Sequence, residues 1–172
     1  HVTVALSGDG GDEAYAGYTT YGWARRYAAM DRIPAPLRRL AGWPSAWLPA
    51  DHTLGRKLHR LSLDTVDRHL EVMSYFPPRE LAQVLSPALA RRLGAHYPYA
   101  AARAAYAPAR GAVGDVAGLL HLDAVTYMTD DVLVKVDRTS MLESLEVRCP
   151  LLDHVVLEFV ARIPFEYKLR GE

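Results

Sequence analysis

Several residue types and patterns are scarce in this sequence, and each absence narrows the class of protein. The 172 residues contain no asparagine and a single cysteine, Cys149. Asparagine accepts N-linked glycans and a disulfide needs two cysteines, so the chain can carry neither an N-glycan nor an internal disulfide. No apolar run approaches the roughly 20 residues of a membrane-spanning helix, and 20 basic residues balance 20 acidic ones. We therefore expect a cytoplasmic protein that binds neither membranes nor nucleic acids.

The length of the chain sets a second expectation. Half of its residues are hydrophobic, and 172 residues are enough to bury a core, so we expect one domain over residues 1–172.

No segment before the first predicted strand could pair with that strand, and the last residues, 167–172, finish no helix or strand. Because an isolated strand cannot satisfy its backbone hydrogen bonds, we expect a piece of a longer chain whose further strands lie upstream.

The first eighteen residues predict a strand, a turn and a helix in succession. Residues 2–6 alternate and include β-branched side chains, residues 7–11 are rich in glycine, and a helical pattern runs from Glu13 to about Met30. A loop of this kind in front of a helix presents free backbone N–H groups, which favour phosphate.

The charges of this loop contradict a simple phosphate site. Asp9 and Asp12 lie in the loop with Glu13 beside them, and bare carboxylates repel phosphate. A bridging divalent cation, or a substrate that is partly cationic or electrophilic, would remove the repulsion.

The rest of the chain is predominantly helical by its apolar periodicity. An apolar stripe at Leu119, Leu122, Val125 and Met128 marks a buried helix, and Leu152 to Ile163 follows the spacing of a core helix. Further helices are predicted over residues 54–63, 65–75 with Asp64 as N-cap, 79–85, 86–93, and 131–143 with Thr129 or Asp130 as cap. Residues 100–114 predict a frayed helix followed by a loop, and residues 145–150 an extended segment. The predicted fold is mainly α, with one strand and about nine helices, inside an α/β domain.

Charged residues gather on the helix predicted over residues 131–143. Asp131, Lys135 and Arg138 stand at positions i, i+4 and i+7, on one face, with Asp137 beside them. An ordinary ion pair on a solvated face is one interpretation, worth a few tenths of a kcal/mol. A face that lines a ligand cleft is the other.

Four segments in order resemble the glutamine-hydrolysing asparagine synthetase family. They are VALSGDGGDE at residues 4–13 with AGY at 16–18, DDVLVKVDRTSM at 130–141, LEVRCPLLDH at 145–154, and IP through KLRG at 163–171. The resemblance covers residues 1–18 and 123–171 and implies the synthetase domain of that family, with an adenine nucleotide alpha hydrolase-like fold.

This resemblance implies an ATP-dependent amidation. In the family, the carboxylate of aspartate attacks the α-phosphorus of ATP with the help of Mg²⁺, and pyrophosphate leaves. Ammonia from glutamine, released by a glutaminase domain in the same longer chain, then displaces AMP. A homodimer is a further expectation. Members of the superfamily that close β-lactam or macrolactam rings remain an alternative, although the acidic residue Asp9 favours an ammonia acceptor.

The resemblance also assigns roles to the loop. Ser7, Gly8 and Gly10 would bind ATP, Asp9 would act in forming the acyl-adenylate and receiving the amine, and Asp12 would be a ligand of Mg²⁺.

The charged helix and the extended segment complete the predicted site. Lys135 and Arg138 are predicted to be catalytic. The residues predicted to orient the site or to have a structural role are Glu13, Asp131, Asp137, Glu146 and Arg148. Cys149 stands where the family often has a small apolar residue, and we interpret it as packing.

Three features of the family are missing from this sequence: the pyrophosphate loop Ser-Gly-Gly-x-Asp-Ser, the N-terminal cysteine of the glutaminase, and a lysine-bearing segment downstream. We therefore expect the 172 residues alone to be inactive. A non-catalytic family member and a metal-binding helical module, with residues 9–13 as a Ca²⁺ loop, remain as alternatives from other classes.

Overall fold

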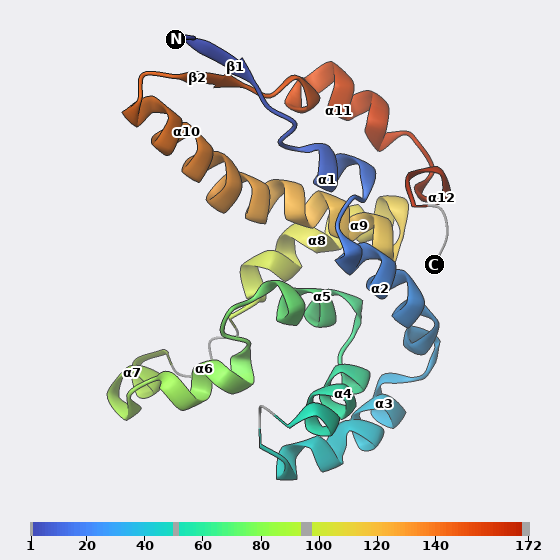
Figure 1. The fold of residues 1–172 in the computed structure, drawn as a ribbon. Coiled ribbons are helices and arrows are strands. Elements are labelled where there is room, and N and C mark those ends of the chain that lie inside the picture. The colour runs from blue at the N-terminus through green and yellow to red at the C-terminus, as the bar shows by residue number, and fades with distance from the viewer. Residues whose placement is uncertain (1, 50–51, 94–97, 170–172) are drawn as a thin grey trace. The chain divides into compact units, whose positions relative to one another are not determined.

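The computed structural model describes residues 2–49, 52–93 and 98–169. In these residues the chain forms twelve α-helices and two short strands, with 3-10 and π-helical segments between them (Figure 1). The predicted fold class, mainly helical with a small strand content, is confirmed. None of the helices in the described ranges combines the length and the apolar character that crossing a membrane requires.

The chain divides into two compact units. Unit 1 comprises residues 1–22 and 105–172, and unit 2 comprises residues 23–104. The divisions fall inside α2 (Thr19–Ala28) and α8 (Ala100–Val113). The single domain predicted for residues 1–172 stays a prediction.

Unit 1 carries both strands and the predicted site. Besides parts of α2 and α8, its elements in chain order are β1 (Val4–Leu6), α1 (Gly11–Tyr15), α9 (Asp115–Asp123), the π-helical η3 (Ala124–Val132), α10 (Leu133–Leu142), β2 (Glu146–Arg148), the 3-10 turn η4 (Pro150–Leu152), α11 (His154–Ala161) and α12 (Phe165–Lys168).

The two strands pair with each other in parallel (Figure 1). Val4 stands opposite Glu146 and Leu6 opposite Arg148, and the N–H of Glu146 donates to the carbonyl of Thr3 at 2.9 Å. The prediction of a single strand was incomplete, because residues 146–148 were predicted only as extended. A partner 142 positions away cannot be found from local pattern, since strand pairing depends on the tertiary fold.

The helix predicted from Glu13 to about Met30 is wrong as one element. It breaks at Ala16, which adopts the left-handed conformation with φ 60°. The chain bends there because the N–H of Gly17 donates to the carbonyl of Asp12 at 2.9 Å, a bond of the kind that ends helices. The break separates α1, which follows the loop, from α2.

The helix predicted to restart at Asp131 does not restart. The chain stays helical from α9 through η3 into α10, and neither Thr129 nor Asp130 is an N-cap. The hydrogen bonds of a π-helix join residues five apart and shift the following side chains around the axis. Leu119, Leu122 and Met128 are buried, as predicted, whereas Val125 in η3 is 42% exposed, so the predicted apolar stripe is wrong only at Val125.

Two further predictions need correction. Residues 100–113 are one helix, α8, rather than a frayed helix and a loop, and α8 ends before Gly114, which has φ 92°. The core helix predicted from Leu152 is helical over α11, but only Val160 is buried there and Phe159 is 66% exposed. Periodicity identifies an apolar face and cannot tell how much of it another element covers.

Unit 2 is built from short helices and turns. Proline signals and caps predicted most of them correctly, including the Asp64 side chain that accepts from the N–H of Asp67 at 3.0 Å. The elements are η1 (Ala29–Arg32), α3 (Ala35–Gly42), η2 (Trp43–Trp47), α4 (Thr53–Ser62), α5 (Thr65–Met73), α6 (Pro78–Val84) and α7 (Pro87–Leu93).

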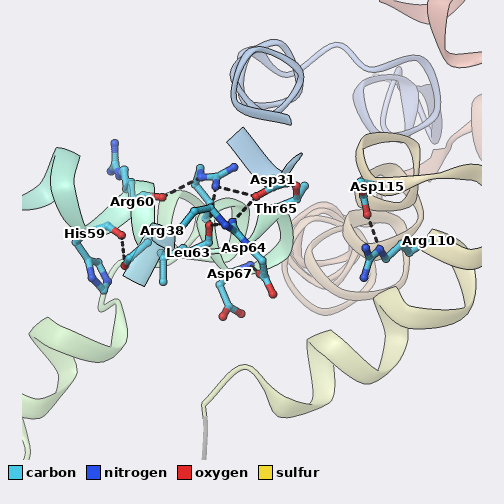
Figure 2. A network of polar contacts seen from close by, with 12 residues as sticks. Asp31, Arg38, His59, Arg60, Leu63, Asp64, Thr65, Asp67, Arg110 and Asp115 are labelled. Carbon is cyan, nitrogen blue, oxygen red and sulfur yellow. Dashed lines mark hydrogen bonds and ion pairs between the residues drawn. The ribbon is translucent and has the colours of Figure 1, made fainter. Parts of the chain in front are cut away.

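A polar network centred on Asp31 joins three parts of unit 2. Its carboxylate accepts from the guanidinium group of Arg38 and from the hydroxyl of Thr65 (Figure 2). It also accepts from the guanidinium group of Arg68. Arg68 is only 4% exposed, and it also donates to the carbonyl of Leu63 at 2.6 Å. Because these cations are removed from water, their pairing with Asp31 holds η1, α3 and α5 together.

Candidate functional site

The site begins where the two parallel strands end. The N–H of Ser7, the first residue after β1, donates to the carbonyl of Arg148, the last residue of β2, at 2.9 Å. This bond places the loop of residues 7–10 beside Cys149, which follows β2. In parallel sheets ligands bind outside the carboxyl ends of the strands, so the location suits a binding loop.

Gly10 gives the loop its shape. It adopts φ +87° and is buried, and a Cβ at this position would overlap with the side chain of Leu152 in η4. A residue with a side chain would be strained by the left-handed conformation and would also push Leu152 away. The glycine is therefore required for the turn that leads into α1.

Asp9 is half-buried and is held by two side chains. Its Oδ2 accepts a hydrogen bond of 2.7 Å from the hydroxyl of Ser7. The thiol of Cys149 approaches the same oxygen, with Sγ and Oδ2 3.8 Å apart. Burial raises the pKa of the Cys149 thiol, and the charge of Asp9 and the hydrogen bond to it raise this pKa further.

Gly8 and Asp12 are the open parts of the loop. Both residues are exposed, and a Cβ at Gly8 would have no atom within 4 Å. The backbone at Gly8 can therefore be approached closely by a ligand. The carboxylate of Asp12 lies over Gly17, where a Cβ would overlap with its Oδ1, so the glycine of the segment AGY leaves room for the Asp12 side chain.

Glu13, in contrast, points into the protein. It is 3% exposed and accepts a 2.9 Å hydrogen bond from the hydroxyl of Tyr18. Burial and the adjacent Glu13 raise the pKa of Tyr18 far above its ordinary value, so Tyr18 stays protonated and remains a donor. Glu13 thus ties α1 to the segment that follows the break.

The charged residues of η3 and α10 lie at the surface. The ammonium of Lys135 is 3.4 Å from Oδ2 of Asp131, and the two side chains are 61% and 55% exposed. Asp137 and Arg138 are exposed as well. In the described ranges no ion pair joins Lys135 or Arg138 to the carboxylates of the loop. The predicted i, i+4 pair therefore exists, and a pair this exposed contributes little to stability.

The two predicted residues of β2 pair with each other. Nε of Arg148 donates to Oε1 of Glu146 at 2.7 Å, and both side chains are more than half exposed. This hydrogen bond and the charge of Glu146 raise the pKa of Arg148, so its guanidinium remains charged at the end of the strand.

Metal-binding capacity at the loop is small. In the part of the chain that the structure describes, no group of three His, Cys, Asp or Glu side chains could hold an ion. A magnesium ion commonly takes only one or two carboxylates and completes its shell with water and phosphate oxygens. The exposed carboxylate of Asp12 can supply one ligand of such an ion. The described residues do not form a metal site from protein ligands alone.

Unit 1 also contains an open cavity of about 930 Å³. Its walls come from α1, α8, α9, η3, α11 and α12 and are mostly apolar, with Glu13, His121 and Lys168 among the polar lining residues. Burial lowers the pKa of Lys168. No local pattern in the sequence predicts this cavity, because its walls come from segments far apart in the chain.

The structure thus brings together part of the predicted site. Ser7, Asp9 and Gly10 form one cluster at the strand ends, and sequence reasoning missed that Cys149 belongs to it. The segment LEVRC carried the signal, because a residue directly after a strand parallel to β1 must lie beside the loop. Arg170 and Gly171, at the end of the predicted family segment, lie outside the described residues.

Comparison with known proteins gives a consistent result. The whole chain, residues 1–172, matches the asparagine synthase family. It is 37% identical over 169 residues to a putative glutamine-hydrolyzing asparagine synthetase of Mycobacterium bovis, covering 98% of this chain and 25% of the relative. It is 30% identical over 171 residues to the glutamine-hydrolyzing asparagine synthetase 1 of Bacillus subtilis, covering 99% of this chain and 26% of that relative. The chain therefore spans about a quarter of the length of these curated relatives. No solved structure matches it significantly.

Proposed function

Because this chain belongs to the asparagine synthase family, we propose that it forms part of the ATP-using domain of a glutamine-hydrolysing asparagine synthetase. The reaction is the adenylation of the side-chain carboxylate of aspartate, or of a related acid, followed by transfer of ammonia. The observation that carries the proposal is the loop of residues 7–12, which lies at the carboxyl ends of β1 and β2. This loop combines the exposed backbone of Gly8 with two carboxylates, the half-buried Asp9 and the exposed Asp12.

The accessible backbone suits ATP. Ser7, Gly8 and Gly10 would form the nucleotide-binding loop, in which the open space above the exposed Gly8 leaves room for close approach and the buried Gly10 fixes the turn. The N-terminus of α1 follows directly, but α1 has only five residues. We therefore assign the binding to the loop rather than to the helix.

Asp9 suits the acyl-transfer half of the reaction. When ammonia attacks the acyl carbon of the adenylate, a C–N bond forms, the bond from the acyl carbon to the AMP oxygen breaks, and the nitrogen must lose a proton. A carboxylate next to the acyl group can accept that proton or hold the ammonia by a hydrogen bond. Asp9 is half-buried and fixed through one oxygen, which is the placement that such a role requires.

Asp12 would hold Mg²⁺, whose charge would neutralise the phosphate oxygens of ATP. The carboxylate is exposed and is positioned over Gly17. It supplies one ligand, in agreement with the small number of protein ligands that Mg²⁺ takes beside phosphates.

The exposed face of η3 and α10 would complete the nucleotide site. Lys135 and Arg138 supply positive charge, and in the described ranges Arg138 has no acidic partner that would compete with a phosphate. Asp131 would orient Lys135, and Glu146 would orient Arg148 at the end of β2, whereas the predicted structural role of Asp137 stays a prediction.

The partners of the reaction are also proposals. A longer protein containing this chain would carry a glutaminase domain that supplies ammonia, and the acid substrate would be aspartate or a close analogue. The homodimer stays a prediction. The metal-binding helical module has little support, because Ca²⁺ needs six to eight oxygen ligands and the described ranges contain no cluster of three candidate side chains.

Aspartate-dependent exchange of labelled pyrophosphate into ATP tests the proposal. The experiment uses a longer protein that contains this chain, and the expected result is Mg²⁺-dependent exchange. Asp12→Asn should raise the Mg²⁺ concentration needed for half-maximal exchange, and Glu158→Gln, on the exposed side of α11, serves as the control. Exchange with another acid but not with aspartate would identify that acid as the substrate in place of aspartate. The absence of exchange with every acid tested would contradict the proposal. The 172-residue chain alone should be inactive.

A further inference from the structure

One side-chain cluster in unit 1 is not explained by the family resemblance. It consists of Ser7, Asp9 and Cys149, and both Ser7 and Cys149 approach the same oxygen of Asp9. The Ser7 hydroxyl is 2.7 Å from Oδ2 and the Cys149 sulfur is 3.8 Å from it. Cys149 stands 140 positions from Asp9 and reaches it because β2 pairs in parallel with β1.

We propose that Cys149 is a positioning residue for Asp9: its thiol and the Ser7 hydroxyl hold Oδ2, so that Oδ1 is left for the amine or the acyl group. This inference rests on the proposed function for the role of Asp9, but the contact itself does not. Ser7 also accepts from the N–H of Asp9 at 3.4 Å. The carboxylate is therefore fixed from its own loop by Ser7 and from the neighbouring strand by Cys149.

The direction of the hydrogen bond follows from the chemistry of the two groups. A carboxylate only accepts, whereas a thiol is a weak donor, so Cys149 must be protonated to hold Asp9. Burial and the charge of Asp9 raise the pKa of the thiol and keep it in that form. The same environment argues against a nucleophilic cysteine, because a reactive thiol needs a lowered pKa.

The other charged groups near Cys149 do not replace Asp9 in this role. Glu146 and Arg148 on β2 pair with each other at 2.7 Å. Among the described residues, it is the charge of Asp9 that raises the pKa of the thiol. Removing the charge of Asp9 should therefore lower the pKa of the Cys149 thiol.

The reactivity of Cys149 tests the contact without any enzymatic reaction. Alkylation by iodoacetamide is followed between pH 7 and pH 10, by mass spectrometry of the peptide that carries Cys149, in the native protein. Asp9→Asn should lower the pKa of the thiol and accelerate alkylation at pH 8 about threefold or more. Glu158→Gln removes a carboxylate on α11 and should leave the rate unchanged. Equal rates for Asp9→Asn and the wild-type protein would overturn the proposal.

Two variants of Cys149 test the positioning role in a longer protein that contains this chain. Cys149→Val keeps the approximate size without a donor, and Cys149→Ser keeps a donor. The turnover number for ammonia-dependent amide formation should fall about two- to fivefold in the valine variant, the loss expected for one weak hydrogen bond, with the KM for ATP unchanged. The serine variant should restore it. Equal turnover of the valine variant and the wild-type protein would overturn the role.

The two measurements separate this inference from the proposed function. If the wild-type protein shows no adenylation but Asp9→Asn accelerates alkylation, the proposed function fails and the contact between Cys149 and Asp9 stands. If adenylation occurs and the alkylation rates are equal, the positioning role fails and the proposed function stands.

Discussion

The hydroxyl of Tyr21 donates a 2.6 Å hydrogen bond to Oδ2 of Asp123, and both side chains are buried. The bond joins α2 to α9 across 102 positions of sequence and thereby anchors the segment that follows the loop of residues 7–12. Burial and the carboxylate of Asp123 raise the pKa of Tyr21 far above its ordinary value, so Tyr21 remains a donor.

Tyr21→Phe should therefore destabilise the protein. Asp123 would lose a buried donor at the cost of about 1–3 kcal/mol, measured as the free energy of unfolding in urea. Tyr15→Phe is the control, since Tyr15 is 40% exposed and its hydroxyl should matter by less than about 0.5 kcal/mol. Equal stabilities of the two variants would contradict the anchoring role.

Gly10→Ala should be more damaging than Gly8→Ala, although the two glycines belong to one loop. At Gly10 the backbone is left-handed and an added Cβ overlaps with Leu152, which together should cost about 2–4 kcal/mol. At Gly8 the added Cβ meets no atom within 4 Å, so stability should change by less than about 1 kcal/mol. Urea unfolding measures both variants, and a similar loss in the two would exclude the special role of Gly10.

The Asp31 network should contribute more to stability than the exposed ion pair of Arg110 with Asp115 (Figure 2). Asp31→Ala leaves Arg38 and the buried Arg68 without their carboxylate, a change that costs about 3–5 kcal/mol for a buried pair. Arg110→Ala breaks a pair whose side chains are 62% and 41% exposed, so the loss should stay below about 1 kcal/mol. Thermal and urea unfolding of the two variants distinguish these values, and the opposite order would show that the network is not what holds unit 2 together.

Acid should weaken unit 2 through Asp64. Burial alone would raise the pKa of Asp64, but the hydrogen bonds from Arg103 and from the N–H of Asp67 outweigh it and lower the pKa. A carboxylate with a depressed folded pKa stabilises the protein above the unfolded pKa of about 3.9. That contribution is lost as the pH falls from there through the folded pKa.

The pH dependence of Asp64→Asn checks this assignment. Between pH 7 and pH 3 the wild-type protein should lose more unfolding free energy than the variant, which has no carboxylate to protonate at this position. Asp137→Asn, which alters an exposed residue of α10, should keep the wild-type slope. Parallel slopes for the wild-type protein and Asp64→Asn would contradict the assignment.

Local sequence signals predicted many helix ends of this protein. Asp64 caps α5 and the Ser86 hydroxyl accepts from the N–H of Leu89 at 3.2 Å, as short polar side chains before a helix indicate. Prolines at the starts of α6 and α7 mark these helices in the same way. These signals act within four residues, so they can be read without the fold.

Predictions that depended on periodicity over longer stretches were less accurate. In the π-helical segment η3, Met128 is buried as expected but Val125 is exposed, and α11 leaves Phe159 exposed. A period of three or four residues describes one helix in isolation. It carries no information on a change of hydrogen-bond register or on what packs against the helix.

The sequence alone determined the family and the identity of the loop residues, because the segment from Ser7 to Glu13 is contiguous and its backbone needs are local. Only the tertiary structure placed Cys149 on Asp9, Leu152 on Gly10 and Glu13 in the interior. The contact of Cys149 with Asp9 depends on the pairing of β1 with β2, whose residues are 142 positions apart. Such pairing is decided by the packing of many segments at once, and no single segment encodes it.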